Sequence, residues 1–287
     1  MVLRGMLGAE RDADPSGDRS PRLAVLSFPK CGRTWLKLML KIYLEQVFKL
    51  DELPLDEEGR WHRRHGSIPK ITFEHDGDPH FKRAEELHQD RSYFADDYVV
   101  LMARDPRDVM VSLYFEMTRR THFYEEWGFD TSAIEKRGTP ISKFIRGSVG
   151  RLDALLRYYG LWAAESRRVK RFLLVRYERM CQEPGEVLRE VLELADLPVD
   201  RQLVTRSVER CSFERMRTDE SSNTFESLTM TPADPSDPDS FKVRRGKVGG
   251  YVDYLSAEDI AWLDERCRQL PDLLSCYHWG SGCPSSN

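Results

Sequence analysis

The chain has 287 residues, of which 40% are hydrophobic and 32% are charged, and its formal net charge is −4. This composition is typical of a soluble globular protein with ample apolar material for a core. The negative charge argues against a protein that binds nucleic acid mainly by long-range attraction. No apolar run is long enough to cross a bilayer, and residues 1–21 lack the apolar segment of a signal peptide. We therefore expect a disordered tail over residues 1–21 and one domain over residues 22–287.

The six cysteines favour a reduced, cytoplasmic protein. Their spacing includes no C-x-x-C pair, and a chain of this length does not need disulfides for stability. Cys276, His278 and Cys283 lie close together in sequence and leave a metal site open as an alternative, although such crowding near a terminus is usually accidental. We expect free thiols and no metal.

The first predicted element is the most informative. The apolar run Leu23–Phe28 predicts a strand, and after the turn Pro29–Thr34 apolar residues recur at helical spacing. A strand that enters a helix through a Gly-containing turn directs backbone N–H groups and the positive helix end at one point, which suits a phosphate or sulfate. Lys30 adds a mobile charge and Thr34 a hydroxyl donor. The turn is not a Walker A sequence, because Lys30 precedes Gly32.

A second strand is predicted over Ile71–His75, after a polar stretch over residues 51–70 that we expect to be a solvated excursion. The strand opens into the turn Asp76–Pro79, so His75 falls at its end. Ligands of open α/β sheets bind at the carboxyl ends of the strands. This position gives His75 a catalytic alternative to the structural role that a lone His more often has.

The apolar run Tyr98–Ala103 predicts a strand buried on both faces. It leads into Arg104–Asp108 and then into a helical pattern, in which Pro106 fits the first turn. Arg104 is therefore expected beside the Lys-containing turn, and Ser112 lies two helical turns further on. A surface network of ion pairs is the alternative reading of the charged residues.

The remaining elements continue the alternation. Residues 114–149 mix aromatic and charged residues and are either a lid over an acceptor or ordinary helix and loop packing. Helices are predicted over Ile141–Ala164, Pro184–Ala195 and Asp259–Leu270, and the strand Phe172–Val175 brings Tyr177 to the same sheet edge. The Pro- and Asp-rich segment Thr229–Ser240 predicts a mobile loop. It leads into a basic cluster of four residues: Lys242, Arg244, Arg245 and Lys247.

Several of these segments, in this order, resemble the sulfotransferases that use 3′-phosphoadenosine 5′-phosphosulfate (PAPS). Phe28–Trp35 is similar to the family's 5′-phosphosulfate loop, and Arg104–Ser112 is similar to its 3′-phosphate segment. Cys211–Met216 resembles the family's Ser-Phe-x-x-Met element, Tyr177-Glu-Arg-Met its Tyr-Glu-x-Met turn, and Arg244–Gly250 its Arg-Lys-Gly-x-x-Gly segment. The resemblance spans nearly the whole chain after residue 21. It implies a single α/β domain with a central parallel sheet flanked by helices and a P-loop-like strand–loop–helix unit.

The resemblance also implies the chemistry. The sulfuryl group of PAPS would move to a hydroxyl or amine of a small-molecule or glycan acceptor, leaving adenosine 3′,5′-bisphosphate (PAP), and neither a metal nor nucleic acid is implied. His75 would act as the general base, and Lys30 would stabilise charge on the leaving group. Further cofactor-binding residues would be Cys31, Gly32, Arg33 and Thr34 at the 5′-phosphate, Arg104, Ser112, Arg244, Arg245 and Gly246 at the 3′-phosphate, and Trp35, Tyr177 and Phe213 around adenine.

The sequence departs from the family pattern at several points. Phe73 stands where cytosolic members often carry a Lys, and the residues Cys31, Arg33 and Cys211 replace the more usual Ser and Thr. Gly249-Gly250-Tyr251 replaces the usual Gly-Asp-Trp, and no Lys–Thr–Val–Glu dimer signature follows it, so the oligomeric state stays open. These changes weaken a match to enzymes that act on small phenols or steroids.

Two other functions stay open at this point. One is a P-loop kinase or nucleotidase, against which the position of Lys30 counts. The other is a module that binds sulfated or phosphorylated ligands without chemistry. The presence of both Lys30 and His75 argues against that module.

Overall fold

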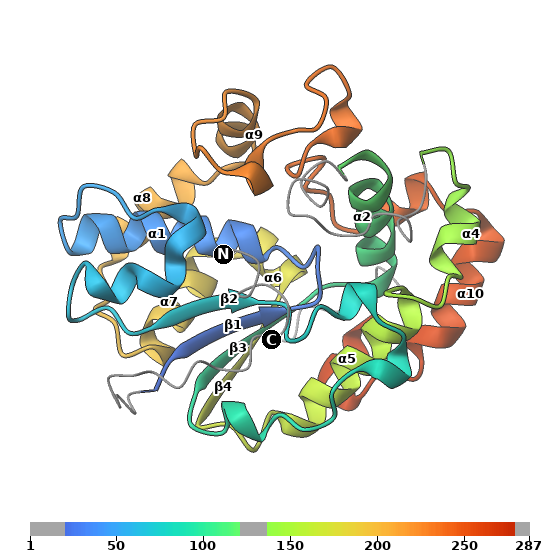
Figure 1. The fold of residues 1–287 in the computed structure, drawn as a ribbon, viewed down its shortest axis with the longest axis horizontal. Coiled ribbons are helices and arrows are strands. Elements are labelled where there is room, and N and C mark those ends of the chain that lie inside the picture. Colours follow the sequence, from blue (N-terminus) through green and yellow to red (C-terminus); the bar gives the residue numbers. More distant parts are fainter. Residues whose placement is uncertain (1–20, 121–136, 279–287) are drawn as a thin grey trace, which may run out of the picture.

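A sheet of four parallel strands forms the centre of the computed structural model, which describes residues 21–120 and 137–278 (Figure 1). The strand order is β2–β1–β3–β4, with β1 at Leu23–Ser27, β2 at Ile71–Glu74, β3 at Tyr98–Ala103 and β4 at Arg171–Arg176. Leu23 pairs with both Ile71 and Tyr98, and Tyr98 pairs with Arg171. The strands therefore start in register and end at one edge. The predicted α/β fold with a parallel sheet is confirmed.

Helices cover the sheet in two groups (Figure 1). One group is α1 (Arg33–Val47), α7 (Pro184–Leu194) and α8 (Arg201–Arg210). The other is α2 (Pro106–Arg119), α4 (Ile141–Ile145), α5 (Leu152–Glu165) and α10 (Ala257–Cys267). The short helix α6 (Tyr177–Gln182) follows β4 directly, and α9 (Phe213–Ser221) lies beyond the sheet.

The core sits between the sheet and these helices. Every residue of β1 is buried, as are the last five of β3, which agrees with strands that are apolar on both faces. The apolar side of α7, formed by Val187, Leu188, Val191 and Leu192, is buried as its periodicity predicts.

Side chains fix the helix starts that surround the strand ends. Asp105 caps α2 by accepting from the backbone N–H of Arg107, and Pro106 occupies the first turn. Ser212 caps α9 in the same way, and Ser256 and Asp259 form a reciprocal capping box on α10. These caps set where each helix begins and so where the preceding loop faces.

The prediction of a solvated excursion over residues 51–70 is wrong for their apolar residues, although most of the charged ones are exposed. This stretch contains the 3₁₀ segment η2 (Leu55–Arg63), and it buries Leu53, Leu55, Trp61 and Ile68. Trp61 packs edge-on against Phe73 of β2, with ring centroids 6.1 Å apart. The apolar residues are spaced without a helical or strand period among many charges, so the periodicity did not indicate burial.

The single helix predicted over Ile141–Ala164 is two helices, α4 and α5. The chain between them approaches another segment closely, because the Gly150 N–H donates to the Lys82 carbonyl over 2.7 Å. A Cβ at Gly150 would lie 1.8 Å from the carbonyl oxygen of His80, and φ at this glycine is +65°. Only glycine fits this position, and the helix is interrupted there.

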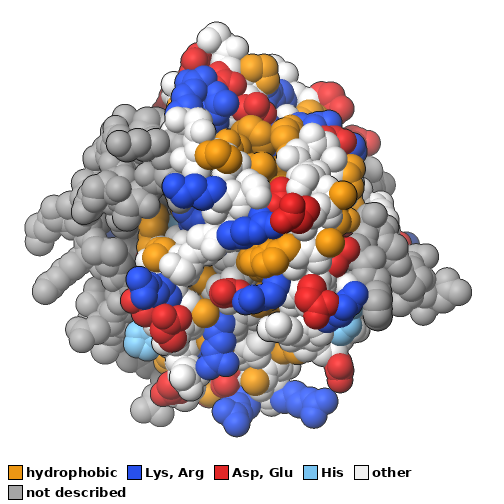
Figure 2. Space-filling view, turned by 90° about the vertical axis from the view of Figure 1, so that its right-hand side faces the viewer, with side chains coloured by type: hydrophobic (Ala, Val, Ile, Leu, Met, Phe, Trp, Pro, Cys, Tyr) orange, Lys and Arg blue, Asp and Glu red, His pale blue; other side chains and the backbone are white. Residues whose placement is uncertain are grey.

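On the face formed by α4 and α10, acidic and basic side chains are interspersed with apolar ones (Figure 2). Arg146 pairs with Asp259 across these two helices, and its guanidinium lies 5.0 Å from the ring centroid of Trp262. This surface therefore carries no concentration of a single sign of charge.

Several sequence predictions fall wholly or partly outside the described residues. They are the tail over residues 1–21, most of the suggested lid over residues 114–149, and Cys283. Among the described residues, the five cysteines are free, no group of three or more metal-binding side chains occurs, and no helix combines the length and apolar character needed to cross a membrane.

Candidate functional site

A cavity of about 910 Å³ lies at the edge where the four strands end. Each strand is followed by a residue that was predicted for the site and lines this cavity: Lys30 after β1, His75 after β2, Arg104 after β3 and Tyr177 after β4. The other predicted residues that line it are Gly32, Arg33, Thr34, Trp35, Ser112, Phe213, Arg244, Arg245 and Gly246. Of the predicted set, only Cys31 does not.

The turn between β1 and α1 has the backbone of an anion-binding loop. Lys30 and Gly32 have positive φ values, of 73° and 89°. A Cβ at Gly32 would lie 2.7 Å from the Tyr177 ring and 2.8 Å from the Met180 methyl group, so a larger residue would clash. Helix α1 begins at Arg33, and its N-terminal residues line the cavity. The positive helix end therefore faces this space.

Cys31 points away from the cavity. It is fully buried, and its Sγ lies 3.5 Å from the hydroxyl of Tyr159. Burial raises the pKa of this thiol to about 12. The same Tyr159 hydroxyl bonds to the backbone of Arg104, at 2.9 Å from both its nitrogen and its carbonyl oxygen. Cys31 thus helps to join the loops after β1 and β3, and only its backbone can serve a ligand.

Lys30 forms an ion pair inside the cavity. Its Nζ lies 2.7 Å from Oε2 of Glu116, and both side chains are about nine-tenths buried. Burial lowers the pKa of Lys30, whereas Glu116 raises it. Burial alone would raise the pKa of Glu116, but Lys30 and Arg120 hold it below its ordinary value. Glu116 was not predicted, although it lies one turn beyond Ser112 on the same face of α2 and could have been found from that spacing.

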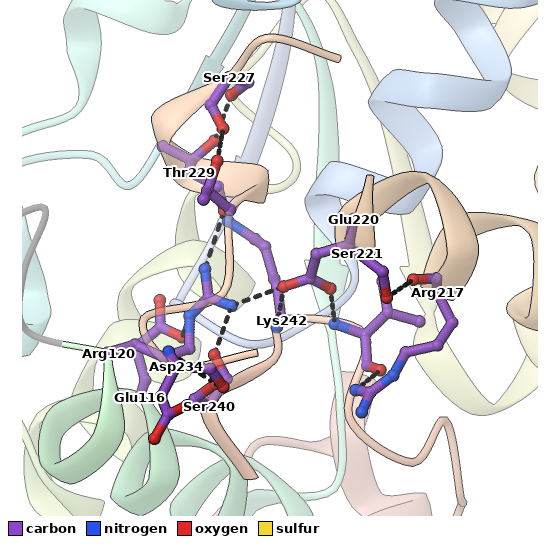
Figure 3. A network of polar contacts seen from close by, with 12 residues as sticks. Glu116, Arg120, Arg217, Glu220, Ser221, Ser227, Thr229, Asp234, Ser240 and Lys242 are labelled. Carbon is purple, nitrogen blue, oxygen red and sulfur yellow. Dashed lines mark hydrogen bonds and ion pairs between the residues drawn. The ribbon is translucent and has the colours of Figure 1, made fainter. Parts of the chain in front are cut away.

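A buried network continues from Glu116 to residues 242–251, which contain the basic cluster and are called the basic segment below (Figure 3). Arg120 lies 3.2 Å from Glu116 and 2.8 Å from Glu220, and it donates to the carbonyls of Thr229 and Ser240. Figure 3 shows these groups converging on the Arg120 guanidinium, which joins α2 to the segment predicted as a loop.

Glu220 completes this connection. It is fully buried on α9, and it accepts the backbone N–H groups of Lys242 and Val243 at 2.6 and 2.8 Å. A chain of ion pairs therefore runs from Lys30 to Glu220, and backbone hydrogen bonds continue it to the residues just before Arg244. No periodic pattern in the sequence indicated that Arg120 or Glu220 is buried, because charged residues near helix ends are usually exposed to solvent.

Lys242 brings another cation to the cavity. Burial lowers the pKa of Lys242, Glu116 opposes this, and Lys30, Arg120 and Arg33 add to the lowering, so that the pKa falls to about 7. The sequence placed Lys242 in the basic cluster but gave it no role. Its neighbours show that it belongs with Lys30 on the inner side of the cavity.

Arg104 occupies a second cationic region. Its guanidinium lies 4.2 Å from the ring centroid of Tyr177, Nη1 donates to the Lys30 carbonyl at 3.2 Å, and Nε is buried without a hydrogen-bond partner. Asp108 accepts from the backbone N–H groups of Gly249 and Tyr251, at 2.8 and 3.0 Å. These bonds hold the basic segment against the start of α2, beside Arg104.

The basic segment presents its arginines at the rim. Arg244 stacks over Phe115 with 4.0 Å between the guanidinium carbon and the ring centroid, while Arg245 pairs with Asp253 at 2.9 Å and is more exposed. At Gly246, where φ is +61°, a Cβ would lie 2.8 Å from the Phe213 ring. The segment therefore packs directly on the aromatic residue at the start of α9.

Aromatic side chains form part of the cavity wall. The Trp35 indole N–H donates to the Cys211 carbonyl at 3.0 Å, and the Trp35 and Tyr177 rings pack edge-on with centroids 6.4 Å apart. With Phe213, these rings offer flat apolar surfaces next to the cations.

His75 has a partner at each ring nitrogen. Nδ1 lies 2.8 Å from the carbonyl oxygen of Ser27, and Nε2 lies 2.8 Å from Nη2 of Arg33. A carbonyl only accepts and a guanidinium only donates, so Nδ1 carries the proton and Nε2 accepts. Burial, Arg33 and His80 together lower the pKa of His75 well below its ordinary value.

Asp76 follows His75 directly and is also able to accept a proton, which makes it the reserve candidate for the base, but its carboxylate is engaged elsewhere. Its carboxylate pairs with Arg91 at 2.8 Å and also accepts from Tyr93 and from the Trp162 indole. Because Asp76 is buried and held by three donors, its role is to anchor the turn after β2.

Sequence comparisons identify the family. Residues 20–274 match the family model described as the sulfotransferase domain. The chain is 24% identical over 293 residues to cytosolic sulfotransferase 17 of Arabidopsis thaliana, covering 92% of this chain and 77% of that protein. It is 21% identical over 282 residues to sulfotransferase 2B1 of Rattus norvegicus, covering 92% of this chain and 75% of that protein.

Solved structures share the fold. Mouse sulfotransferase SULT7A1 complexed with PAP superposes with a TM-score of 0.60 at 16% identity, covering 91% of this chain and 88% of that chain. Retinol dehydratase in a complex with retinol and PAP gives a TM-score of 0.59 at 12% identity, covering 88% and 82%.

Proposed function

The chain belongs to the sulfotransferase domain family, and we propose that it transfers the sulfuryl group of PAPS to a hydroxyl or amine of an acceptor. One observation carries the proposal: the cavity at the strand ends joins a P-loop-like turn, a second cationic region and a neutral His. Lys30 belongs to the first, Arg104 to the second, and His75 lies beside them.

The residues present fit a nucleotide with two separate anionic groups. The Lys30–Thr34 turn and the N-terminus of α1 suit a 5′-phosphosulfate, and Arg104 with Arg244 suits a 3′-phosphate. The buried Nε of Arg104, which has no partner among the described residues, is a donor available to such a phosphate. Trp35 and Phe213 offer apolar faces for adenine. PAPS supplies an activated sulfuryl group attached to its 5′-phosphate.

Lys30 and His75 have different tasks in the proposed reaction. Sulfuryl transfer resembles phosphoryl transfer, in which catalysis consists mainly of positioning and stabilisation of charge. The Lys30 ammonium stabilises the negative charge that grows on the leaving oxygen. His75 accepts the hydroxyl proton at Nε2, because this nitrogen carries the lone pair and Nδ1–H is fixed on Ser27.

We further propose a small-molecule or glycan acceptor. The wall of the cavity that His75 lines combines apolar side chains, such as Leu55 and Phe81, with charged ones, such as Lys37 and Asp78. Such a mixed wall suits an acceptor that has both an apolar body and polar groups. The chain would act in the cytoplasm, as the names of its plant relatives indicate for those proteins.

A screen of acceptors tests the proposal. Alcohols, phenols, saccharides and amines are incubated with PAPS whose sulfur is labelled, and products are detected by the transferred label. The expected result is transfer to at least one class by the unaltered protein and its loss in Lys30→Ala. Turnover of ATP with magnesium, without use of PAPS, would instead identify a kinase or nucleotidase. Tight binding of PAP without transfer to any acceptor would identify a binding module.

A further inference from the structure

Arg33 does not extend over the loop in which it lies. It is the first residue of α1, and its guanidinium reaches the end of β2, where Nη2 contacts Nε2 of His75 at 2.8 Å. Glu58, Glu74 and Asp78 lie in its surroundings, yet no carboxylate of the described residues comes within 4.0 Å of it. Its Nη1 is buried and has no hydrogen-bond partner among the described residues. Arg33 is therefore a partly buried cation whose one side-chain hydrogen bond within the described residues goes to an imidazole.

The contacts of His75 explain what this arrangement does. Ser27 of β1 accepts from Nδ1, so the ring orientation and the tautomer are fixed from one side. The titratable groups whose charge lowers the pKa of His75 are Arg33 from α1, His80 from η3 (Pro79–Phe81) at 5.4 Å between ring centroids, and Lys242 from the segment after η8 (Pro238–Ser240). Two of them are cations, and none is a carboxylate. Protonation of His75 would add a positive charge directly against the Arg33 guanidinium.

Nε2 is also the atom that a general base must offer to its substrate. Because Nη2 of Arg33 occupies the lone pair, an acceptor hydroxyl has to replace that guanidinium nitrogen. The displaced group keeps donors directed into the cavity, since Arg33 lines it together with Lys30. The contact between Arg33 and His75 thus occupies the Nε2 lone pair until the acceptor hydroxyl replaces the guanidinium.

We propose that Arg33 is a positioning residue for His75, which holds the imidazole neutral with the Nε2 lone pair toward the cavity and yields it to the acceptor hydroxyl. This role rests on the proposed function. As the acceptor oxygen bonds to sulfur, the bond between sulfur and the 5′-phosphate oxygen breaks, and its electron pair stays on the oxygen of PAP. The hydroxyl proton moves to Nε2, and the adjacent guanidinium promotes its later release to solvent.

The competing role is that of a phosphate ligand, which the sequence suggested for Arg33. The two roles predict different consequences of removing the guanidinium. A phosphate ligand contributes to the affinity for PAP and leaves His75 unaffected. A positioning residue leaves that affinity nearly unchanged and controls the protonation of His75.

The test compares Arg33→Gln with Thr34→Ala, a neighbouring variant in the same loop. Calorimetry with PAP is expected to give Arg33→Gln a Kd within about twofold of the unaltered protein, whereas Thr34→Ala weakens binding about tenfold, as loss of a hydrogen bond to a charged group does. NMR of the histidine side chains, with His75 assigned through His75→Asn, is expected to show its titration moving to higher pH by about one unit or more in Arg33→Gln only.

These measurements need no acceptor, so they stand even if the transferase proposal fails. Once an acceptor is known, the acidic limb of kcat/KM should move to higher pH by the same amount as the NMR titration. An unchanged His75 titration in Arg33→Gln, or a loss of PAP affinity as large as that of Thr34→Ala, would overturn the proposal. If Arg33→Gln does not fold, Arg33→Met, which keeps the aliphatic stem, is measured in the same way with the same two outcomes.

Discussion

Lys30 and His75 follow adjacent strands, β1 and β2, but their side chains have opposite surroundings. Lys30 contacts a carboxylate, Glu116, and belongs to a chain of buried ion pairs that continues through Arg120 to Glu220. His75 contacts a carbonyl and a guanidinium and has no acidic hydrogen-bond partner among the residues that the structure describes. In the first environment a carboxylate favours the charged form of Lys30 against the effect of burial, whereas in the second burial and neighbouring cations favour the neutral form of His75. In the proposed reaction, the cavity thus separates the group that would stabilise negative charge, Lys30, from the group that would accept a proton, His75.

Removal of the proposed base should have the largest effect. We expect His75→Asn to lower turnover by about 10²–10⁴-fold, because general base catalysis contributes about that much. PAP affinity and the melting temperature should change little, since Asn can still donate to the Ser27 carbonyl. Steady-state kinetics, PAP calorimetry and thermal melting measure the three quantities. His88→Asn, at an exposed histidine, is the control. Near-normal turnover in His75→Asn together with its loss in Asp76→Asn would mean that the base has been misassigned.

Removal of the Lys30 charge should give the next largest effect. Lys30→Ala is expected to lower kcat by about 10²–10³-fold, as loss of one group that stabilises transition-state charge does, with a smaller loss of cofactor affinity. Arg245→Ala, at the rim of the cavity, should do the reverse. The assignment fails if both variants alter only the apparent affinity for PAPS.

The buried network beyond Glu116 should matter for stability more than for chemistry. Glu220→Gln removes the charge opposite Arg120 and weakens the acceptor of the Lys242 and Val243 N–H groups. Breaking one side of a buried pair costs about 3–5 kcal/mol, which chemical denaturation measures directly. The exposed residue Glu258 provides a matched control, because Glu258→Gln should change stability by less than about 0.5 kcal/mol. Equal effects of the two substitutions would show that the network does not hold the basic segment.

A smaller effect should appear in the pH dependence of folding. His75 has a lowered pKa in the folded state, so the unfolded chain binds its proton first as the pH falls below about 6.5. Stability is therefore expected to fall with decreasing pH, and His75→Asn should reduce the slope by up to about 1.4 kcal/mol per pH unit. Burial lowers the pKa of His80 to about 3, so His80 contributes in the same direction and part of the slope should remain. Identical slopes in the two proteins would contradict a His75 that is neutral in the folded state.

Sequence patterns predicted the site residues that follow the carboxyl ends of strands. Lys30, His75, Arg104 and Tyr177 were all placed at the cavity because each follows a predicted strand, and parallel strands end at one edge of the sheet. Burial of both faces made β1 and β3 recognisable from composition alone.

The residues that were missed depend on tertiary pairing. Glu116, Arg120 and Glu220 are charged residues on helices, and nothing local distinguishes them from solvated ones. Their burial is possible because α2, α9 and the basic segment bring opposite charges together over about a hundred residues of sequence, as in the Arg120–Glu220 contact. Arg33 was assigned to the loop by its position in sequence, whereas the length of its side chain carries its guanidinium to another strand.

The most direct test of the account is the selectivity of the cavity for a nucleotide with two separate phosphates. Melting temperatures are measured with saturating PAP, AMP and ATP, in the unaltered protein and in Arg104→Gln. The account predicts a much larger increase with PAP than with AMP or ATP, and a reduction of the PAP effect toward that of AMP in Arg104→Gln. Equal increases with all three nucleotides would contradict a 3′-phosphate site at Arg104 and, with it, the use of PAPS.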